Sequence, residues 1–469
     1  MRVRMLIGAL SCVWCVGAAC AAWAEYEDCD SGSLEAQPKN VIVMIGDGMG
    51  PQQLKLARLF AESEEGGEKK LTLYDPDLGL DPDPSSMTTH NVYGEVTDSA
   101  AAATAMATGI KTYNGALAVD VYGQPITTAW ECAEFVSGKK TGIVSSVFLI
   151  DATPGVWAAH TTSRYNYSEV AVQQALKEDP DLEPPDIGEV EVLLGAGRIY
   201  YQPKGANGTG GPNLIEMLQD QGYDYVRKAS ELERSAADKI LGFFGGTAMT
   251  YVLNRPLNKN LTEPTLADMT AKAIEILDRD NDTGFFLVVE GGGIDWVAHK
   301  LDVAGTLHEV LGFDEAVAEA FEFAKANGDT LLVVTADHET GGLQVGELDA
   351  AFLAGIRATT DFIQTEIDGG MTIEAALETY AGVGGKGSPW PKLSAQEIQH
   401  IQSCGDALGI SDVLNARAGV SWGWSDCKGG HHTGVEVDVF AYGPGAEKFG
   451  GDAFDNTNIG ILLKDAVTH

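Results

Sequence analysis

Side chains that can bind metal ions or transfer protons follow four apolar runs in this sequence. A single acid after an apolar run usually caps a helix or binds turn amides, but four such runs in one chain are harder to explain in this way. Parallel strands end at one edge of a sheet, so these side chains are predicted to meet there. They are Asp47 after residues 41–45, Asp151 and Thr153 after 143–147, Glu290 after 285–289, and Asp337 and His338 after 331–335.

Two further patterns offer ligands for a transition metal. Asp295 and His299 are four residues apart in GIDWVAH, which places both on one face of a helix. A carboxylate beside an imidazole suits zinc, although ordinary Asp–His surface pairs share this spacing. His432 precedes a Thr-Gly pair, and the chain has only nine histidines. Three of them, His299, His338 and His432, therefore fall among the candidate ligands.

Ser99 is the candidate nucleophile. Asp98 and Ser99 open the run DSAAAATAMATG, which predicts a helix over 99–108 that ends at Gly109. Free amides and the helix dipole at its start favour an anion, although plain N-capping is the commoner use of such residues. A nearby metal ion would lower the pKa of the Ser99 hydroxyl. Arg164, in HTTSRYNY, carries the planar fork that can bind two phosphate oxygens.

The elements that must position these residues indicate an α/β fold with a largely parallel central sheet flanked by helices. Short apolar runs alternate along the chain with helical patterns. Residues 278–284 resemble a calcium loop with its glycine one place late, and we interpret them as a helix-to-strand turn. The apolar runs are 41–45, 143–147, 192–194, 285–289, 331–335 and 435–442, and the helical patterns are 54–64, 99–108, 266–278 and 306–327.

Residues 343–431 interrupt this alternation with glycines, tryptophans and mixed helices. The segment is too long for a simple connection, so we expect an inserted crown or interface subdomain. The catalytic α/β domain is then predicted to comprise residues 25–342 and 432–469.

Residues 1–24 have the pattern of a secretory signal peptide, with Arg2 and Arg4, an apolar stretch and an A-x-A site that ends at Ala24. A membrane anchor is the less favoured alternative, because the apolar run barely reaches spanning length. No second apolar run of about twenty residues follows. We therefore expect an exported protein, periplasmic or extracellular, without a membrane anchor in its mature form.

Charge and cysteine content narrow the class further. The chain has 31 Lys and Arg against 68 Asp and Glu, a net charge of −37, which argues against nucleic-acid binding and against a polybasic membrane surface. Cys29, Cys132, Cys404 and Cys427 remain after the signal peptide, and an even number permits two disulfides with three possible pairings. We favour a pair between Cys404 and Cys427.

Six motifs occur in order along the chain: GDGMG, TDSAAAATAMATG, DATPGVWAAHTTSR, VEGGGIDWVAH, TADHETGG, and HHTG to AYGPGA. Together they resemble the alkaline phosphatase family from about Asn40 to the C-terminus, outside the inserted regions. The resemblance implies hydrolysis of phosphate monoesters at alkaline pH, with a phosphoseryl intermediate and release of inorganic phosphate. It also implies a homodimer, with residues 343–431 as the expected interface.

The same resemblance implies a role for each candidate residue. Ser99 would take the phosphoryl group, and Asp98 would orient Arg164, which would bind the phosphate oxygens. Two zinc ions and one magnesium ion would offset the carboxylates, and the first zinc would stabilise the leaving oxygen and then supply the hydroxide that displaces phosphate. The implied ligands are Asp295, His299 and His432 for the first zinc, Asp47, Asp337 and His338 for the second, and Asp47, Thr153 and Glu290 for magnesium, with Asp151 contacting its waters.

Trp296 departs from the best-known bacterial pattern, which has Lys after the zinc-ligand Asp. Trp at this place resembles some marine and cold-adapted members, but those tend to have His where this chain has Asp151, so the identity of the third ion stays open. Two alternatives are a phosphodiesterase or sulfatase of the same superfamily, and a non-catalytic phosphate- or zinc-binding protein. The first usually carries Thr or a modified Cys as nucleophile, and the second would lack a ligand or the nucleophile. Ser99 with Arg164 favours monoester hydrolysis.

Overall fold

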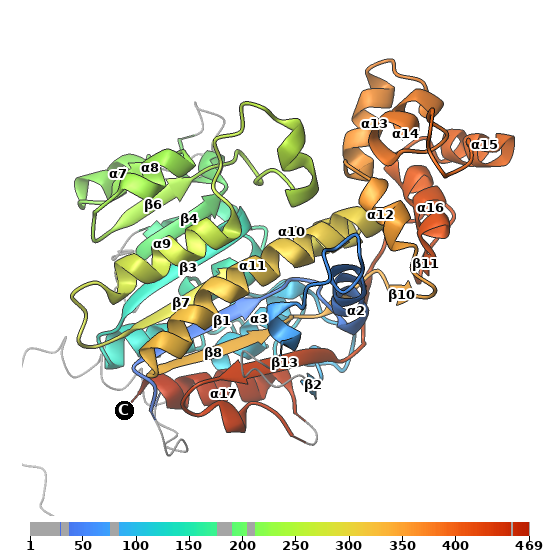
Figure 1. The fold of residues 1–469 in the computed structure, drawn as a ribbon. Helices are drawn as coiled ribbons and strands as arrows, with labels where there is room; N and C mark the ends of the chain where they lie inside the picture. The colour runs from blue at the N-terminus through green and yellow to red at the C-terminus, as the bar shows by residue number, and fades with distance from the viewer. Residues whose placement is uncertain are drawn as a thin grey trace, which may run out of the picture.

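The computed structural model describes residue 29 and residues 37–75, 84–175, 190–203, 212–451 and 454–468. The predicted signal peptide at 1–24 lies outside the described residues. A nine-stranded sheet forms the centre of the molecule, with helices on both faces (Figure 1). Among the described helices, none combines the length and the apolar character that a membrane span requires.

The central sheet runs in the order β2-β13-β8-β1-β7-β3-β4-β6-β5. The strands from β8 to β5 pair in parallel, while β13 is antiparallel to both of its neighbours. This confirms the predicted fold class. The strands are β1 Asn40–Ile45, β2 Ser85–Met87, β3 Lys140–Phe148, β4 Val190–Ala196, β5 Asp224–Val226, β6 Ile240–Phe243, β7 Phe285–Glu290, β8 Thr330–Thr335 and β13 Val437–Tyr442.

The middle strands are buried along their whole length, which explains their sequences. Every residue of β1, β7 and β8 is buried, and parallel strands covered on both faces read as continuous apolar runs. The predicted run at 435–442 begins two residues too early, because β13 starts at Val437. His432 lies before it in the short strand β12 (His432–Thr433), which pairs with β9 (Glu339–Thr340).

Helices cover the two faces of the sheet (Figure 1). The helices α3 (Ser99–Thr108) and α9 (Leu266–Asp278) have the predicted bounds. α11 begins at Val303 rather than 306, because the Asp302 side chain caps its first turn. The others are α2 Pro51–Ala61, α4 Ala129–Glu131, α5 Ala152–Gly155, α6 Tyr167–Ala175, α7 Leu214–Asp220, α8 Ala229–Arg234, α10 Gly293–Ala298 and α17 Asn456–Val467, besides short 3-10 turns and one π turn.

A group of helices lies to one side of the sheet, in orange in Figure 1. It falls within the predicted insertion at 343–431, whose role as a separate subdomain stays a prediction. The strands β10 (Gln344–Val345) and β11 (Val420–Ser421) pair at its base. The helices are α12 Ala350–Gly355, α13 Thr360–Asp368, α14 Ile373–Ala381, α15 Ala395–Cys404 and α16 Ala407–Ala418.

Two disulfides join distant parts of the chain. Cys404 pairs with Cys427, which confirms the favoured pairing, and Cys29 pairs with Cys132.

Candidate active site

Side chains predicted to bind metal ions or take part in catalysis meet at the edge of the sheet where the parallel strands end. The strands β8, β1, β7 and β3 are neighbours there, and each ends in or just before one or two of the candidates. All of these residues are buried, as polar groups that face a shared internal site would be. They are Asp337 and His338 after β8, Asp47 after β1, Glu290 at the end of β7, and Asp151 and Thr153 after β3.

One group of contacts surrounds the Nε2 atom of His338. The Ser99 Oγ lies 3.1 Å from this nitrogen, Asp337 Oδ2 lies 3.1 Å from it, and Asp47 Oδ1 lies 3.6 Å from it. Thr153 donates its hydroxyl to the other Asp47 oxygen, at 3.1 Å. A hydroxyl, an imidazole and two carboxylates therefore converge on one point.

A second group joins α10 to β12. The Nε2 atom of His299 lies 3.3 Å from Asp295 Oδ2 and 3.2 Å from His432 Nε2. Asp295 and His299 thus share one side of α10, as their spacing predicts. His432 Nε2 is 3.7 Å from the other oxygen of Asp295. Burial, with the charge of the neighbouring His338, lowers the pKa of His432 to about 4, so this imidazole is neutral at alkaline pH.

All three imidazoles turn the same nitrogen into the cluster. His299 donates from Nδ1 to the Gly430 carbonyl at 2.7 Å, and His432 donates from Nδ1 to the Thr97 carbonyl at 3.0 Å. The Nδ1 of His338 is 3.2 Å from Thr340 Oγ1. A partner on Nδ1 leaves the Nε2 lone pair free, which is how histidines that bind metals are oriented.

Buried carboxylate oxygens in the site lack a hydrogen-bond donor among the described atoms. They include Asp47 Oδ1 and Glu290 Oε1. Burial raises the pKa of both carboxyl groups, and repulsion from neighbouring carboxylates, chiefly Asp337 for Asp47 and Asp151 for Glu290, raises it further. Cations would satisfy these oxygens and remove the repulsion. Imidazole with carboxylate suits zinc, and carboxylate with hydroxyl oxygen suits magnesium, so the residues fit divalent cations.

Two supporting residues were missed by the sequence analysis. Thr340 donates to Asp295 Oδ1 at 2.6 Å while contacting His338, and so joins the two groups. Ser145, on the neighbouring strand β3, donates its hydroxyl to the Glu290 carboxylate at the end of β7. Thr340 lies within the quoted motif TADHETGG, and Ser145 lies beside Glu290 in the β3–β7 register. The motif was therefore a visible signal for Thr340, whereas Ser145 could be recognised only once the register was known.

Arg164 lies beside the start of α3. Asp98 caps this helix by accepting from the Ala101 amide, and its other oxygen is 3.3 Å from an Arg164 nitrogen. A second Arg164 nitrogen donates to Asp151 at 2.8 Å, a contact that the sequence analysis did not predict. Burial lowers the pKa of the guanidinium, but Asp151 and Asp98 outweigh this and raise it above its usual range. Arg164 is therefore a fixed cation near Ser99.

Trp296 follows Asp295 on α10 and is half-buried. Its ring packs against Phe148, at the end of β3, with the ring centres 5.6 Å apart. The ring thus lies at the border of the site without a charge of its own.

The profile of the alkaline phosphatase family matches residues 38–469. The chain belongs to this family. It is 34% identical over 464 residues to alkaline phosphatase 4 of Bacillus subtilis, and the matched region covers 94% of this chain and 93% of that protein. It is 38% identical over 347 residues to the alkaline phosphatase of Escherichia coli, covering 65% of this chain and 71% of that protein.

Solved structures agree with this family membership. A cold-active alkaline phosphatase from a Shewanella species superposes with a TM-score of 0.76 at 30% identity, covering 91% of this chain and 98% of that one. The alkaline phosphatase of Thermus thermophilus gives a TM-score of 0.79 at 25% identity, covering 93% and 92%. The predicted family and enzyme class, phosphoric monoester hydrolase, are confirmed.

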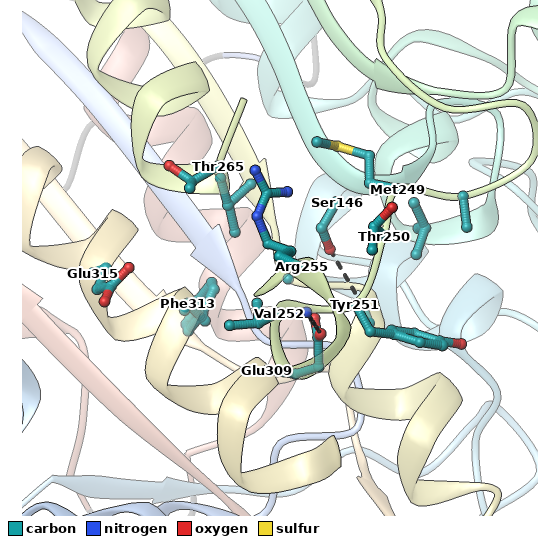
Figure 2. Close-up of a pocket in the computed structure, with 16 residues that line it drawn as sticks. Ser146, Met249, Thr250, Tyr251, Val252, Arg255, Thr265, Glu309, Phe313 and Glu315 are labelled. Carbon is teal, nitrogen blue, oxygen red and sulfur yellow. Dashed lines mark hydrogen bonds between the residues drawn. The ribbon is translucent and has the colours of Figure 1, made fainter. Parts of the chain in front are cut away.

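A cavity of about 60 Å³ lies behind the loop that joins β7 to α10 (Figure 2). None of the candidate catalytic residues lines it. Ser146 accepts a hydrogen bond from the Gly293 amide at one wall, and Glu309 of α11 accepts from the Val252 amide at 2.7 Å at another. A Cβ at Gly293 would lie 2.2 Å from Glu309 Oε2, so the carboxyl group packs directly against the start of α10.

Burial raises the pKa of Glu309 from 4.5 to about 7. The folded protein favours the neutral carboxyl group of Glu309. The stability that this group contributes is therefore complete below pH 4.5 and is lost as the pH rises through about 7. Glutamine cannot ionise, so the unfolding free energy of Glu309→Gln relative to the native protein should rise as the pH goes from 5 to 8. The expected rise is about 2 to 3 kcal/mol. Denaturant unfolding at each pH measures this. Glu315→Gln, which removes an exposed carboxylate from the same helix, is the control, and an equal gain in the control would contradict the account.

Proposed function

We propose that the chain hydrolyses phosphate monoesters at alkaline pH through a phosphoseryl intermediate on Ser99, with two zinc ions and one magnesium ion. The observation that carries this proposal is the position of Ser99. Ser99 is 3% exposed and starts helix α3, and its hydroxyl lies 3.1 Å from a histidine nitrogen that also faces two buried carboxylates. Phosphate release from a chromogenic monoester, compared between the native protein and Ser99→Ala, tests it.

The two groups of contacts support the metal ligands that the family resemblance implies. One zinc would be held by Asp295, His299 and His432, whose ligand atoms lie within 4.8 Å of one another. The second would be held by Asp47, Asp337 and His338. Magnesium would take the unpartnered oxygens of Asp47 and Glu290 with the Thr153 hydroxyl, and Asp151 would contact its waters. When bound, the cations lower the pKa of the serine hydroxyl and of a water molecule and neutralise charge on the transferred group.

The chain's own residues account for the rest of the reaction. Ser99 Oγ attacks phosphorus, the bond from phosphorus to the alcohol oxygen breaks, and the alcohol leaves with a proton. Arg164 binds the non-bridging oxygens through its planar fork, and Asp98 holds it in place. The free amides at the start of α3 face the same negative charge. Water then attacks the phosphoserine, which releases inorganic phosphate and restores Ser99.

Trp296 sets how tightly product phosphate is held. An ammonium group at this place would add an attraction for phosphate that the indole does not supply. We therefore expect Trp296→Lys to lower the inhibition constant for inorganic phosphate about 3- to 10-fold, as measured by competitive inhibition of monoester hydrolysis. Trp296→Phe, which keeps the contact with Phe148 without a charge, is the control. An unchanged or raised constant in Trp296→Lys would count against this role.

Export and dimerisation complete the proposal. Two disulfides are typical of proteins that leave the reducing cytosol, which supports the signal peptide assigned to residues 1–24. The family resemblance supports a homodimer, with residues 343–431 at the interface. Sedimentation equilibrium should give twice the mass of one mature chain, and a variant without that segment should sediment as a monomer. A monomeric native protein would exclude this interface.

A further inference from the structure

A second polar pocket lies at the carboxyl ends of β4, β6 and β5, with a volume of about 380 Å³. Arg198 reaches it from the turn after β4, and Arg227 and Lys228 reach it from the segment between β5 and α8. Gly245 and Gly246, directly after β6, form part of its wall. Ligands of open α/β sheets bind outside the carboxyl ends of the strands, so the pocket is at the edge where binding is expected.

Among the described residues, the three cations that line this pocket have no acidic ion-pair partner. In the described part of the chain, no carboxylate forms an ion pair with Arg198, Arg227 or Lys228, and no hydrogen bond from their side chains is found. By contrast, Arg279 and Arg417 each pair with a carboxylate. Acidic residues outnumber basic ones 68 to 31 in the chain, so a pocket lined by three such cations has the opposite charge to the protein as a whole.

One acid, Glu231, also lines the pocket, so three positive charges face one negative charge there. Glu231 accepts a hydrogen bond from the Arg227 backbone amide at 2.8 Å, so its carboxylate is bound to the main chain just before α8. The charges of Arg227 and Arg198 also act together on Tyr225: burial raises the pKa of this phenol, and the two guanidinium groups oppose the rise. Both arginine side chains therefore lie near one ring, and the pocket is a local positive region on an acidic protein.

The pocket is separate from the proposed catalytic centre. The Gly197 amide donates to the Gly246 carbonyl at 3.1 Å, and the Phe244 amide donates to the Gly195 carbonyl at 2.9 Å. These bonds hold the ends of β4 and β6 together independently of the candidate metal ligands. Within the sheet, β4 lies next to β3, whose end leads to Asp151, so both sites open along one edge.

We propose that this pocket is a second anion site, which binds a phosphate group without a metal ion. Two guanidinium forks can each bind two oxygens of a tetrahedral oxyanion, and the lysine adds a third positive charge. The choice of phosphate over other oxyanions rests on the proposed function, which releases phosphate at the same edge of the sheet. The bound group is either inorganic phosphate or the phosphate of an organic ester.

Equilibrium dialysis of labelled inorganic phosphate against the metallated enzyme tests the proposal. The variant replaces Arg198, Arg227 and Lys228 with Gln, and the control replaces Lys69, Lys259 and Lys448, which are exposed elsewhere, with Gln. We expect two classes of phosphate site in the native protein and the control. In the variant, the second class should weaken at least about tenfold, while kcat/KM for a chromogenic monoester stays within about twofold. Arg227→Gln alone, at an exposed position, should show the same change in part.

Competition and chelation experiments identify the ligand and separate this proposal from the proposed function. Competition by methylphosphonate, an analogue whose P–C bond is not hydrolysed, would show that the pocket accepts a phosphoryl group with an organic substituent, whereas competition by inorganic phosphate alone would show that it accepts only the free anion. In chelated protein the second class should persist, since it needs no metal ion. One class of site in the native protein, or an equal loss in variant and control, would overturn the proposal. If the native protein does not hydrolyse monoesters but still shows the second class of phosphate site, only the proposed function is rejected.

Discussion

Replacing Ser99 with alanine should lower kcat/KM for a phosphate monoester by at least about 10³-fold. The serine oxygen forms the bond to phosphorus, and no other hydroxyl contacts His338 Nε2 among the described residues. Water attacking directly would lose the advantage of a nucleophile already placed at the start of α3. Steady-state kinetics with a chromogenic monoester at alkaline pH measures the effect.

The fold should survive this substitution. Alanine is the best helix former, and Ser99 begins a run of alanines, so the free energy of unfolding should change little. Ser63→Ala, which removes a hydroxyl bonded only within its own turn, is the matched control and should keep native activity. Native-like kinetics in Ser99→Ala, or a comparable loss in Ser63→Ala, would refute the role of the nucleophile.

Removal of the metal ions should abolish hydrolysis. Without cations, Asp47 and Glu290 remain buried with unpartnered oxygens and with pKa values raised by burial and mutual repulsion. Activity should fall to background in chelator and return in full only when zinc and magnesium are both added. Melting should also occur at lower temperature in chelator, because ions that bind only the folded state add about 4 kcal/mol of stability at 1,000 times their dissociation constant.

Adding zinc or magnesium separately to the chelated protein distinguishes the zinc sites from the magnesium site. Zinc alone should restore part of the activity through Asp295, His299 and His432, and magnesium alone should restore none. Full activity in the presence of an excess of chelator would contradict the metal assignment, since the proposed mechanism needs a Lewis acid at this centre.

The sequence allowed the sheet and most of the site to be predicted because both depend on local signals. α3 and α9 have the predicted bounds because their alanine content, caps and apolar spacing all act within a few residues. The buried strands read as unbroken apolar runs. β5 and β6 were not predicted, because segments as short as DYV and ILGF carry little periodicity.

Contacts between distant residues could not be predicted in the same way. Ser145 and Glu290 are 145 residues apart and meet only through strand register. Arg164 was placed near Asp98 by resemblance, but its shorter contact, to Asp151, depends on how the loop after β3 folds. The basic pocket draws Arg198 and Arg227 from two separate loops, and neither is part of a recognisable motif.

The most direct test of the central claim is to find the phosphoryl group on the enzyme during turnover. The metallated protein is mixed with a monoester, quenched in acid within milliseconds and digested, and the peptides are sequenced by mass spectrometry. The account predicts one added phosphoryl group, on Ser99, that is absent without substrate and in Ser99→Ala. Turnover with no phosphorylated peptide, or with the group on another residue, would contradict it.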